Sequence, residues 1–203
     1  MSTSPSRTTV PAEPYLLADH PVLDMLNTVA TVSGDRHEFW QTDADVIRWL
    51  IRTGWVEESA AADLPRQGLA EVARDLRETI RALVEAKKGG ERADPGGLNQ
   101  WLRRAASHPV LTWTAAADIR LERQRKRETA EDVLAPLAEA AAEFLVEADF
   151  RLVRKCEHPE CSLWFYDRTK SRRRRWCSMA LCGNRSKVAR FRKRQQQRTK
   201  GED

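Results

Sequence analysis

Apolar residues recur at helical spacing through the first 150 residues of the chain. The pattern predicts five helices, whose apolar positions lie within residues 22–29, 46–51, 69–83, 98–102 and 133–145. Thr42 and Thr129 each stand three residues before an Asp, an arrangement that resembles the capping box at a helix start. Gly34, Gly54 and the pair Gly89–Gly90 mark the expected ends of the first three helices. We therefore expect a mainly α fold for this part of the chain.

Two short apolar runs interrupt the helical pattern. Residues 110–113 and 119–121 predict a small β-hairpin that turns around Ala115–Asp118. Pro136 lies inside the last predicted helix and is expected to kink it or to shift its start, because proline removes an interior hydrogen bond. The tryptophans at positions 40, 49, 55 and 101 are interpreted as core residues.

Length and composition limit the class of protein. A chain of 203 residues with 41% hydrophobic residues can form one domain of ordinary size with a small second one. No window of 18 apolar residues is present, so we expect no membrane span. The Ser-, Thr- and Pro-rich residues 1–14 lack the apolar core of a secretory signal and predict a flexible leader. We therefore expect a cytoplasmic protein whose four cysteines are reduced.

Charge is distributed unevenly along the chain. Residues 151–203 contain 17 Lys and Arg against 5 Asp and Glu, a net charge of +12. The other 150 residues contain 18 basic and 25 acidic residues, a net charge of −7. A basic carboxy-terminal region after an acidic domain indicates a polyanionic partner.

All four cysteines lie in the basic region. Cys156, Cys161, Cys177 and Cys182 form the pattern C-x4-C-x15-C-x4-C, in which two close pairs can surround one tetrahedral ion. Four thiolates favour zinc and close its coordination shell, so we expect one structural Zn²⁺ rather than a catalytic one. His158, between the first two cysteines, is a less favoured alternative ligand.

The segment around the cysteines predicts a small finger. Residues 163–166 are apolar and aromatic and suit a hairpin strand, and Asn184 can cap a helix that runs to Arg194 or beyond. A knuckle, a hairpin and then a helix follow the order of a treble-clef-like finger. The whole chain is thus expected to be mainly α, with a helical amino-terminal domain that includes a small β-hairpin, followed by this zinc finger.

The cysteine segment also resembles a known family. The tetrapeptide Cys182-Gly-Asn-Arg185, preceded by the other three cysteines and by Trp176, resembles the CGNR zinc finger. The motif Leu23-Asp-Met-Leu-Asn-Thr28 resembles the opening of the ABATE-type domain that usually precedes this finger. The resemblance covers the chain from about Tyr15 to Arg194. It implies a bacterial, stress-induced transcription regulator whose finger binds zinc and DNA. Independently of the resemblance, the sequence contains no Gly-rich phosphate loop, nucleophile elbow or HExxH motif, so we expect no enzyme.

We divide the chain accordingly into four segments. These are the leader 1–14, an ABATE-like sensor or dimerisation domain over 15–150, the finger over 151–195 and a disordered tail over 196–203.

The finger helix is expected to present a basic face to double-stranded DNA. At about 100° per residue, Val188 and Phe191 form an apolar stripe that is expected to pack on the zinc-bound hairpin. The candidate nucleic-acid contacts lie around it and just before Cys177: Arg172, Arg173, Arg174, Arg175, Arg185, Lys187, Arg190, Lys193 and Arg194. Binding to RNA or to the ribosome is the alternative, because the same cations suit A-form phosphates.

The amino-terminal domain is expected to sense a ligand or to dimerise. Asp24, Asn27 and Thr28 lie within about one helical turn and can line a polar pocket, although the sequence alone favours surface positions on the helix for Asp24 and Asn27. A small-molecule effector and a second copy of the chain are the expected further partners. A deep pocket at these residues would instead favour a small-molecule enzyme with an accessory finger.

Overall fold

The computed structural model describes residues 11–32 and 34–199, and the side chains of Val32, Lys193, Arg198 and Thr199 lie outside that description. The chain divides into two compact units. One combines the described residues up to Phe39 with those from Asp149 onward, and the other spans Trp40–Ala148. Within the described part, no helix is long and apolar enough to cross a membrane.

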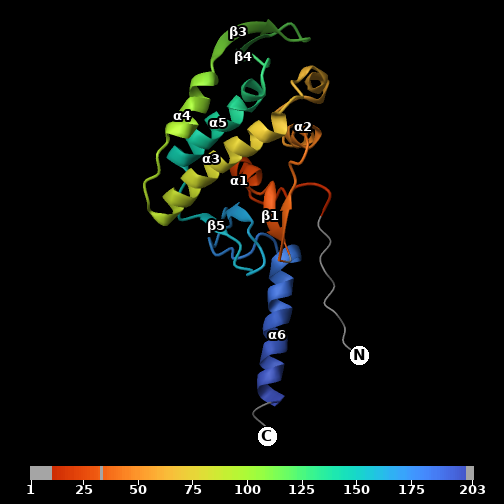
Figure 1. Cartoon of the computed structure of the whole chain (residues 1–203), viewed down its shortest axis with the longest axis vertical. Coiled ribbons are helices and arrows are strands. Elements are labelled where there is room, and N and C mark those ends of the chain that lie inside the picture. The colour runs from red at the N-terminus through yellow and green to blue at the C-terminus, as the bar shows by residue number, and fades with distance from the viewer. Residues whose placement is uncertain (1–10, 33, 200–203) are drawn as a thin grey trace. The chain divides into compact units, whose positions relative to one another are not determined.

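The Trp40–Ala148 unit is mainly helical, as expected. It contains α2 (Asp43–Arg52), the 3₁₀ turn η1 (Glu58–Asp63), α3 (Leu69–Gly89), α4 (Gly96–Arg104) and α5 (Ala130–Glu147). The helices α3, α4 and α5 pack against one another (Figure 1). Trp40, Trp49 and Trp101 are buried in this unit, which confirms their assignment to the core, and Trp55 is half-buried.

The helix starts of this unit follow the predicted capping residues. The Thr42 and Thr129 hydroxyls accept hydrogen bonds from the backbone N–H groups of Asp45 and Asp132, and both capping boxes are complete. The start of α5 is not shifted by Pro136, because the helix runs from Ala130 through this residue.

A hairpin of β3 (Ser107–Trp113) and β4 (Ile119–Arg125) connects α4 to α5. Its register pairs Trp113 with Ile119 and extends to Ser107 and Arg125. The predicted hairpin is therefore confirmed, and it is longer than the apolar runs indicated, because polar residues such as Ser107 and Glu122 continue the strands.

The other unit is built from short elements at both ends of the chain. It contains α1 (Pro21–Leu26), the hairpin β1–β2 (Val29–Val32 and Asp35–Glu38), the hairpin β5–β6 (Val153–Lys155 and Trp164–Tyr166), the π turn η2 (Met179–Gly183) and α6 (Asn184–Thr199). Its core gathers Ala30, Leu163, Phe165 and three of the cysteines, with Tyr15 and Phe39 packed against them.

Two expectations for this unit are corrected. The first predicted helix ends at Leu26 rather than continuing to Val29, because the β-branched residues of Val29–Val32 pair as a strand and Gly34, with φ +91°, turns the chain back. At the other end, α6 continues through residues 196–199, which were expected to be a disordered tail, because Gln and Arg favour the helix. Residues 200–203 and most of the predicted leader lie outside the described residues.

Candidate functional site

The four cysteines form one cluster in the folded chain. All four Sγ atoms lie within 4.8 Å of one another, with Cys161 and Cys177 3.9 Å apart and Cys177 and Cys182 3.6 Å apart. A tetrahedral Zn²⁺ with four thiolates at about 2.3 Å places its sulfur atoms about 3.8 Å apart. The cluster therefore fits one zinc ion.

Two turns position the sulfur atoms. Cys156 follows β5, where its N–H donates to the Leu163 carbonyl at 2.9 Å, and the Cys161 N–H donates to the His158 carbonyl at 3.0 Å. In the second turn the Ser178 carbonyl accepts the N–H groups of both Cys182 and Gly183. The sequence thus supplies each cysteine pair from a tight backbone turn, as the spacing predicted.

The thiols are electrostatically coupled. The hydrogen bond with Cys161 lowers the pKa of Cys156, whereas the hydrogen bond with Cys156 raises the pKa of Cys177. Four thiols this close cannot all ionise unless a cation compensates their charge. Zinc supplies that compensation and would be held by Cys156, Cys161, Cys177 and Cys182.

His158 does not join the thiol cluster. Its Nδ1 accepts the Glu160 N–H at 3.2 Å, and the metal-binding group found among the described residues consists of the four cysteines. The alternative with a histidine ligand is therefore not supported. Zinc is a structural cofactor here, because the four thiolates leave no coordination position for a substrate.

The arginines before Cys177 have different environments. Arg172 and Arg173 are exposed, and Arg175 pairs with Glu157 at 2.6 Å. Arg174 instead turns inward: its guanidinium lies 4.3 Å from the centre of the Phe165 ring and donates to Asp19 and to the carbonyls of Leu17, Trp176 and Cys177. Arg174 therefore holds the finger together and is removed from the candidate nucleic-acid contacts.

A buried carboxylate fixes the same arginine loop. Asp167 is fully buried and accepts hydrogen bonds from the hydroxyl of Thr169 at 2.6 Å and from the N–H of Arg174 at 2.9 Å. Burial alone would raise the pKa of Asp167, but these bonds lower it below its usual value. Sequence reasoning missed this residue, although Asp-x-Thr is typical of a side chain that closes a local turn.

The helix α6 carries most of the remaining candidate cations. Lys187, Arg190 and Arg194 are exposed, whereas Arg185, in the first turn, pairs with Glu160 at 2.8 Å. The Lys193 side chain lies outside the described residues. Figure 1 shows α6 extending away from the small hairpins of its own unit. These side chains are therefore presented to solvent along a single helix.

The apolar residues of α6 are not packed as expected. Val188 is 48% exposed and Phe191 60% exposed, because the helix continues beyond the small zinc-bound region that could have covered them. Val188 lines a groove of about 670 Å³ between the knuckle at His158–Glu160 and the first turns of α6, together with Leu181 and Arg192.

The polar residues of the amino-terminal motif are used inside the protein. The Asn27 side chain forms two hydrogen bonds with the backbone of Trp164: it accepts the N–H at 2.8 Å and donates to the carbonyl at 2.9 Å. Thr28 is buried and donates to the Met25 carbonyl, and Asp24 accepts the Ala18 N–H. The geometry therefore corrects the expected ligand pocket: Asn27 attaches the motif to the zinc hairpin, and Asp24 and Thr28 bond to neighbouring backbone groups of their own segment.

These contacts also place the amino-terminal segment in the same compact unit as the finger. The described residues up to Phe39 share a unit with the finger, and the Ser162 N–H and Tyr166 N–H bond to the carbonyls of Thr31 and Ala18. A boundary near residue 150 separates the segments along the sequence, but the folded finger includes the amino-terminal segment as well.

Comparisons with known proteins agree with the metal site and with the order of the segments. Residues 19–148 match the family model ABATE, described as "Putative stress-induced transcription regulator". Residues 152–195, which include all four cysteines, match the CGNR zinc finger. A search of the curated proteins gives no match. With more than half of its length matched by the first model, the chain belongs to the ABATE family and carries a CGNR zinc finger.

Proposed function

We propose that the protein is a transcription regulator that binds double-stranded DNA through α6 and the exposed arginines before Cys177. The observation that carries this proposal is the placement of Lys187, Arg190 and Arg194 on an exposed helix that begins two residues after the zinc ligand Cys182. A helix of 16 residues is about 24 Å long, enough to cross a major groove about 12 Å wide.

The zinc cluster gives this helix a fixed start. Cys182 lies in η2, the turn that leads directly into Asn184, and its sulfur is 3.6 Å from that of Cys177. Metal binding therefore fixes the first turn of α6, while the remaining turns stay accessible to a polyanion. Most of the cations would contact phosphates and so position the protein without reading the sequence.

Double-stranded DNA is favoured over RNA because of the shape of the basic element. A single helix enters the wide major groove of B-form DNA, whereas the major groove of A-form RNA is too narrow for side chains to read. We likewise propose a binding function rather than catalysis. The Asp24 and Asn27 side chains, which would have lined the pocket of an enzyme, form hydrogen bonds within the protein instead.

Paired variants test the DNA surface. Lys187→Ala with Arg190→Ala is expected to weaken duplex binding by roughly tenfold or more, since each lost phosphate contact removes part of the electrostatic affinity, and to leave zinc content unchanged. Arg66→Ala with Arg103→Ala removes the same charge from exposed positions of the Trp40–Ala148 unit and serves as the control. Equal losses in both pairs, or tighter binding to a duplex RNA of the same length, would refute the assignment.

A further inference from the structure

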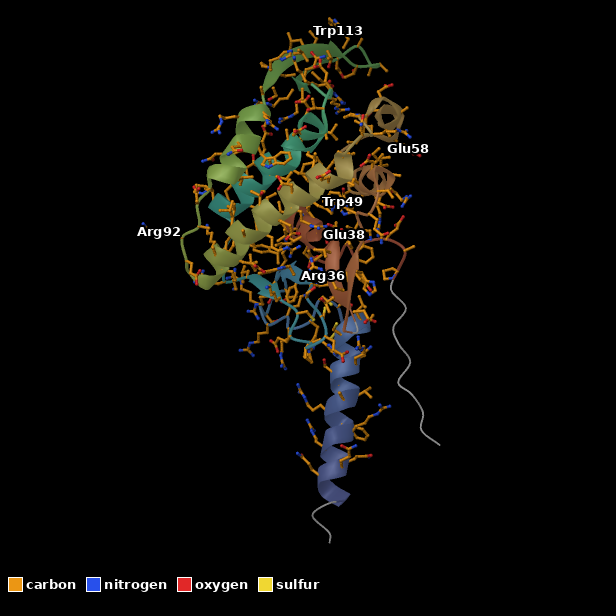
Figure 2. The ribbon with its side chains drawn as sticks, in the orientation of Figure 1. Arg36, Glu38, Trp49, Glu58, Arg92 and Trp113 are labelled. Carbon is orange, nitrogen blue, oxygen red and sulfur yellow. The ribbon has the colours of Figure 1, made fainter. Side chains whose placement is uncertain are left out.

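The β3–β4 hairpin carries a large apolar face that is open to solvent. Its register pairs Leu111 with Leu121 and Trp113 with Ile119, so all four side chains lie on the same side of the hairpin. Their exposed fractions are 70% and 72% for the leucines, 73% for Trp113 and 57% for Ile119. Figure 2 shows Trp113 on the part of the hairpin that extends beyond the helices of its unit.

The hydrogen-bond pattern makes this face compact. The Thr114 N–H donates to the Asp118 carbonyl at 2.9 Å, so this pair is a hydrogen-bonded one. The pairs Trp113–Ile119 and Leu111–Leu121 are then non-hydrogen-bonded pairs, in which the side chains of the two strands lie closest together. The opposite side of the hairpin is mostly polar and holds His108, Thr112, Arg120, Glu122 and Gln124.

An exposed apolar face of this size indicates a surface that a partner buries. The largest apolar patch on a typical monomer is about 300–600 Å² and is often functional, and four large side chains that are more than half exposed fall in that range. A two-stranded hairpin is also marginally stable by itself. We propose that the covering partner is the same hairpin of a second copy of this chain, packed face to face and antiparallel across a two-fold axis.

The distribution of charge along the hairpin favours a second copy of the same hairpin as the partner. The centre of the apolar face holds no charged residue, and Arg123 lies at the stem on the apolar side. An antiparallel arrangement brings the turn of one hairpin to the stem of the other, so that Arg123 approaches the Trp113–Ile119 pair of the second copy, where it can lie over the Trp113 ring, rather than another Arg123.

The area is also sufficient for a dimer. Two such faces together bury on the order of 1,000 Å², at the low end of specific protein interfaces. A two-fold contact of this kind closes on itself and stops at two copies. The inference uses only the Trp40–Ala148 unit and does not depend on the proposed binding of DNA.

Introducing a charge at the centre of the apolar face tests the interface. Sedimentation of the full-length, zinc-loaded wild type is expected to show a concentration-dependent dimer at tens of micromolar. Leu111→Lys and Leu111→Glu are each expected to weaken the dimer at least about tenfold, because like charges then meet across the two-fold axis. An equimolar mixture of the two variants is expected to dimerise again, which a merely misfolded hairpin would not do.

Gln124→Lys and Gln124→Glu provide the matched control, since they introduce the same charges on the opposite side of the hairpin. These two variants are expected to dimerise like the wild type. A wild type that stays monomeric overturns the proposal, and so does one that binds anionic phospholipid vesicles as a monomer. A dimer that persists in Leu111→Lys, or variants whose mixture stays monomeric, would place the interface elsewhere.

Discussion

At the scale of single residues, the Asn27 side-chain amide pairs with backbone groups in the way that a neighbouring strand would. Asn27 satisfies both backbone groups of Trp164, a residue 137 positions away, and all of these atoms are buried. A buried backbone group that loses its partner costs about 1–3 kcal/mol. Asn27 therefore links the amino-terminal motif to the zinc hairpin by a contact that no aliphatic side chain can reproduce.

Asn27→Ala is expected to lower the free energy of unfolding by about 2–4 kcal/mol, because both the N–H and the carbonyl of Trp164 become unpaired. Denaturant unfolding of the zinc-loaded protein measures the change. Asn99→Ala, an exposed position in α4, is the control. An equal unfolding midpoint for the two variants would show that the paired amide does not stabilise the fold.

His20 is expected to make the stability of the fold depend on pH. Burial, followed by the positive charge of Arg168, lowers the pKa of His20 to about 4, and its Nδ1 accepts the Val22 N–H at the start of α1. Because the ordinary pKa is near 6.5, the neutral ring adds stability that is complete above about pH 6.5 and is lost as the pH falls toward 4.

The wild type is therefore expected to lose stability relative to His20→Asn as the pH is lowered from about 6.5 to 5. Unfolding curves of both proteins across this range give the difference between their free energies of unfolding. Loss of zinc in acid affects both proteins alike and therefore cancels in this difference. Parallel curves would contradict a depressed pKa.

At the scale of elements, η2 and α6 depend on the metal. Cys182 lies in η2, so its sulfur ties the start of α6 to the cysteines of the other turn. The helix itself is polar on almost every side, and isolated helices of this length are marginal in water. Metal coordination, rather than packing, is thus expected to hold α6 in place.

Cys182→Ser is expected to remove the bound zinc and a large part of the α6 helicity, since three thiolates no longer close the shell. Metal analysis and circular dichroism report the two losses, with about one zinc per chain expected for the wild type. Ser178→Ala, which removes a hydroxyl beside the same turn, is expected to keep the metal. Full zinc occupancy in Cys182→Ser would rule out a four-thiolate site.

The elements that could be predicted are those with local signals. Thr42 and Thr129 marked helix starts, and the spacing of the four cysteines marked the metal site, because each depends on residues close in sequence or on a chemistry few residues share. The β1–β2 hairpin was missed since Val29 continued the helical repeat of α1. The link between Asn27 and Trp164 and the inward turn of Arg174 are contacts across the fold, so no local pattern could reveal them.

At the scale of the whole molecule, the folded finger is longer than its sequence motif. Leu17, Ala18 and Thr31 all bond to residues after 160, and Ala30 lies in the same core as the cysteines. The Trp40–Ala148 unit has its own core of buried residues, which come mainly from its helices. The chain is thus expected to separate into these two units, not at a single boundary near residue 150.

Fragments test this division. Residues 40–148 alone are expected to unfold cooperatively, whereas residues 149–203 alone are expected to lose zinc to a chelator at least about tenfold faster than the full chain, because their bonds to Ala18, Asn27 and Thr31 are absent. Competition with a chromogenic chelator measures the rate. Equal rates for the fragment and the full chain would show that the finger folds without the amino-terminal segment.

The central claim is that a zinc-anchored basic helix binds DNA through phosphates, and the salt dependence of duplex binding tests it most directly. If roughly six phosphates are neutralised, log affinity should fall with log salt with a slope of about −5 for the wild type. Removing Lys187 and Arg190 together should bring that slope about 2 units closer to zero. A slope near zero, or one unchanged in the double variant, would contradict the claim.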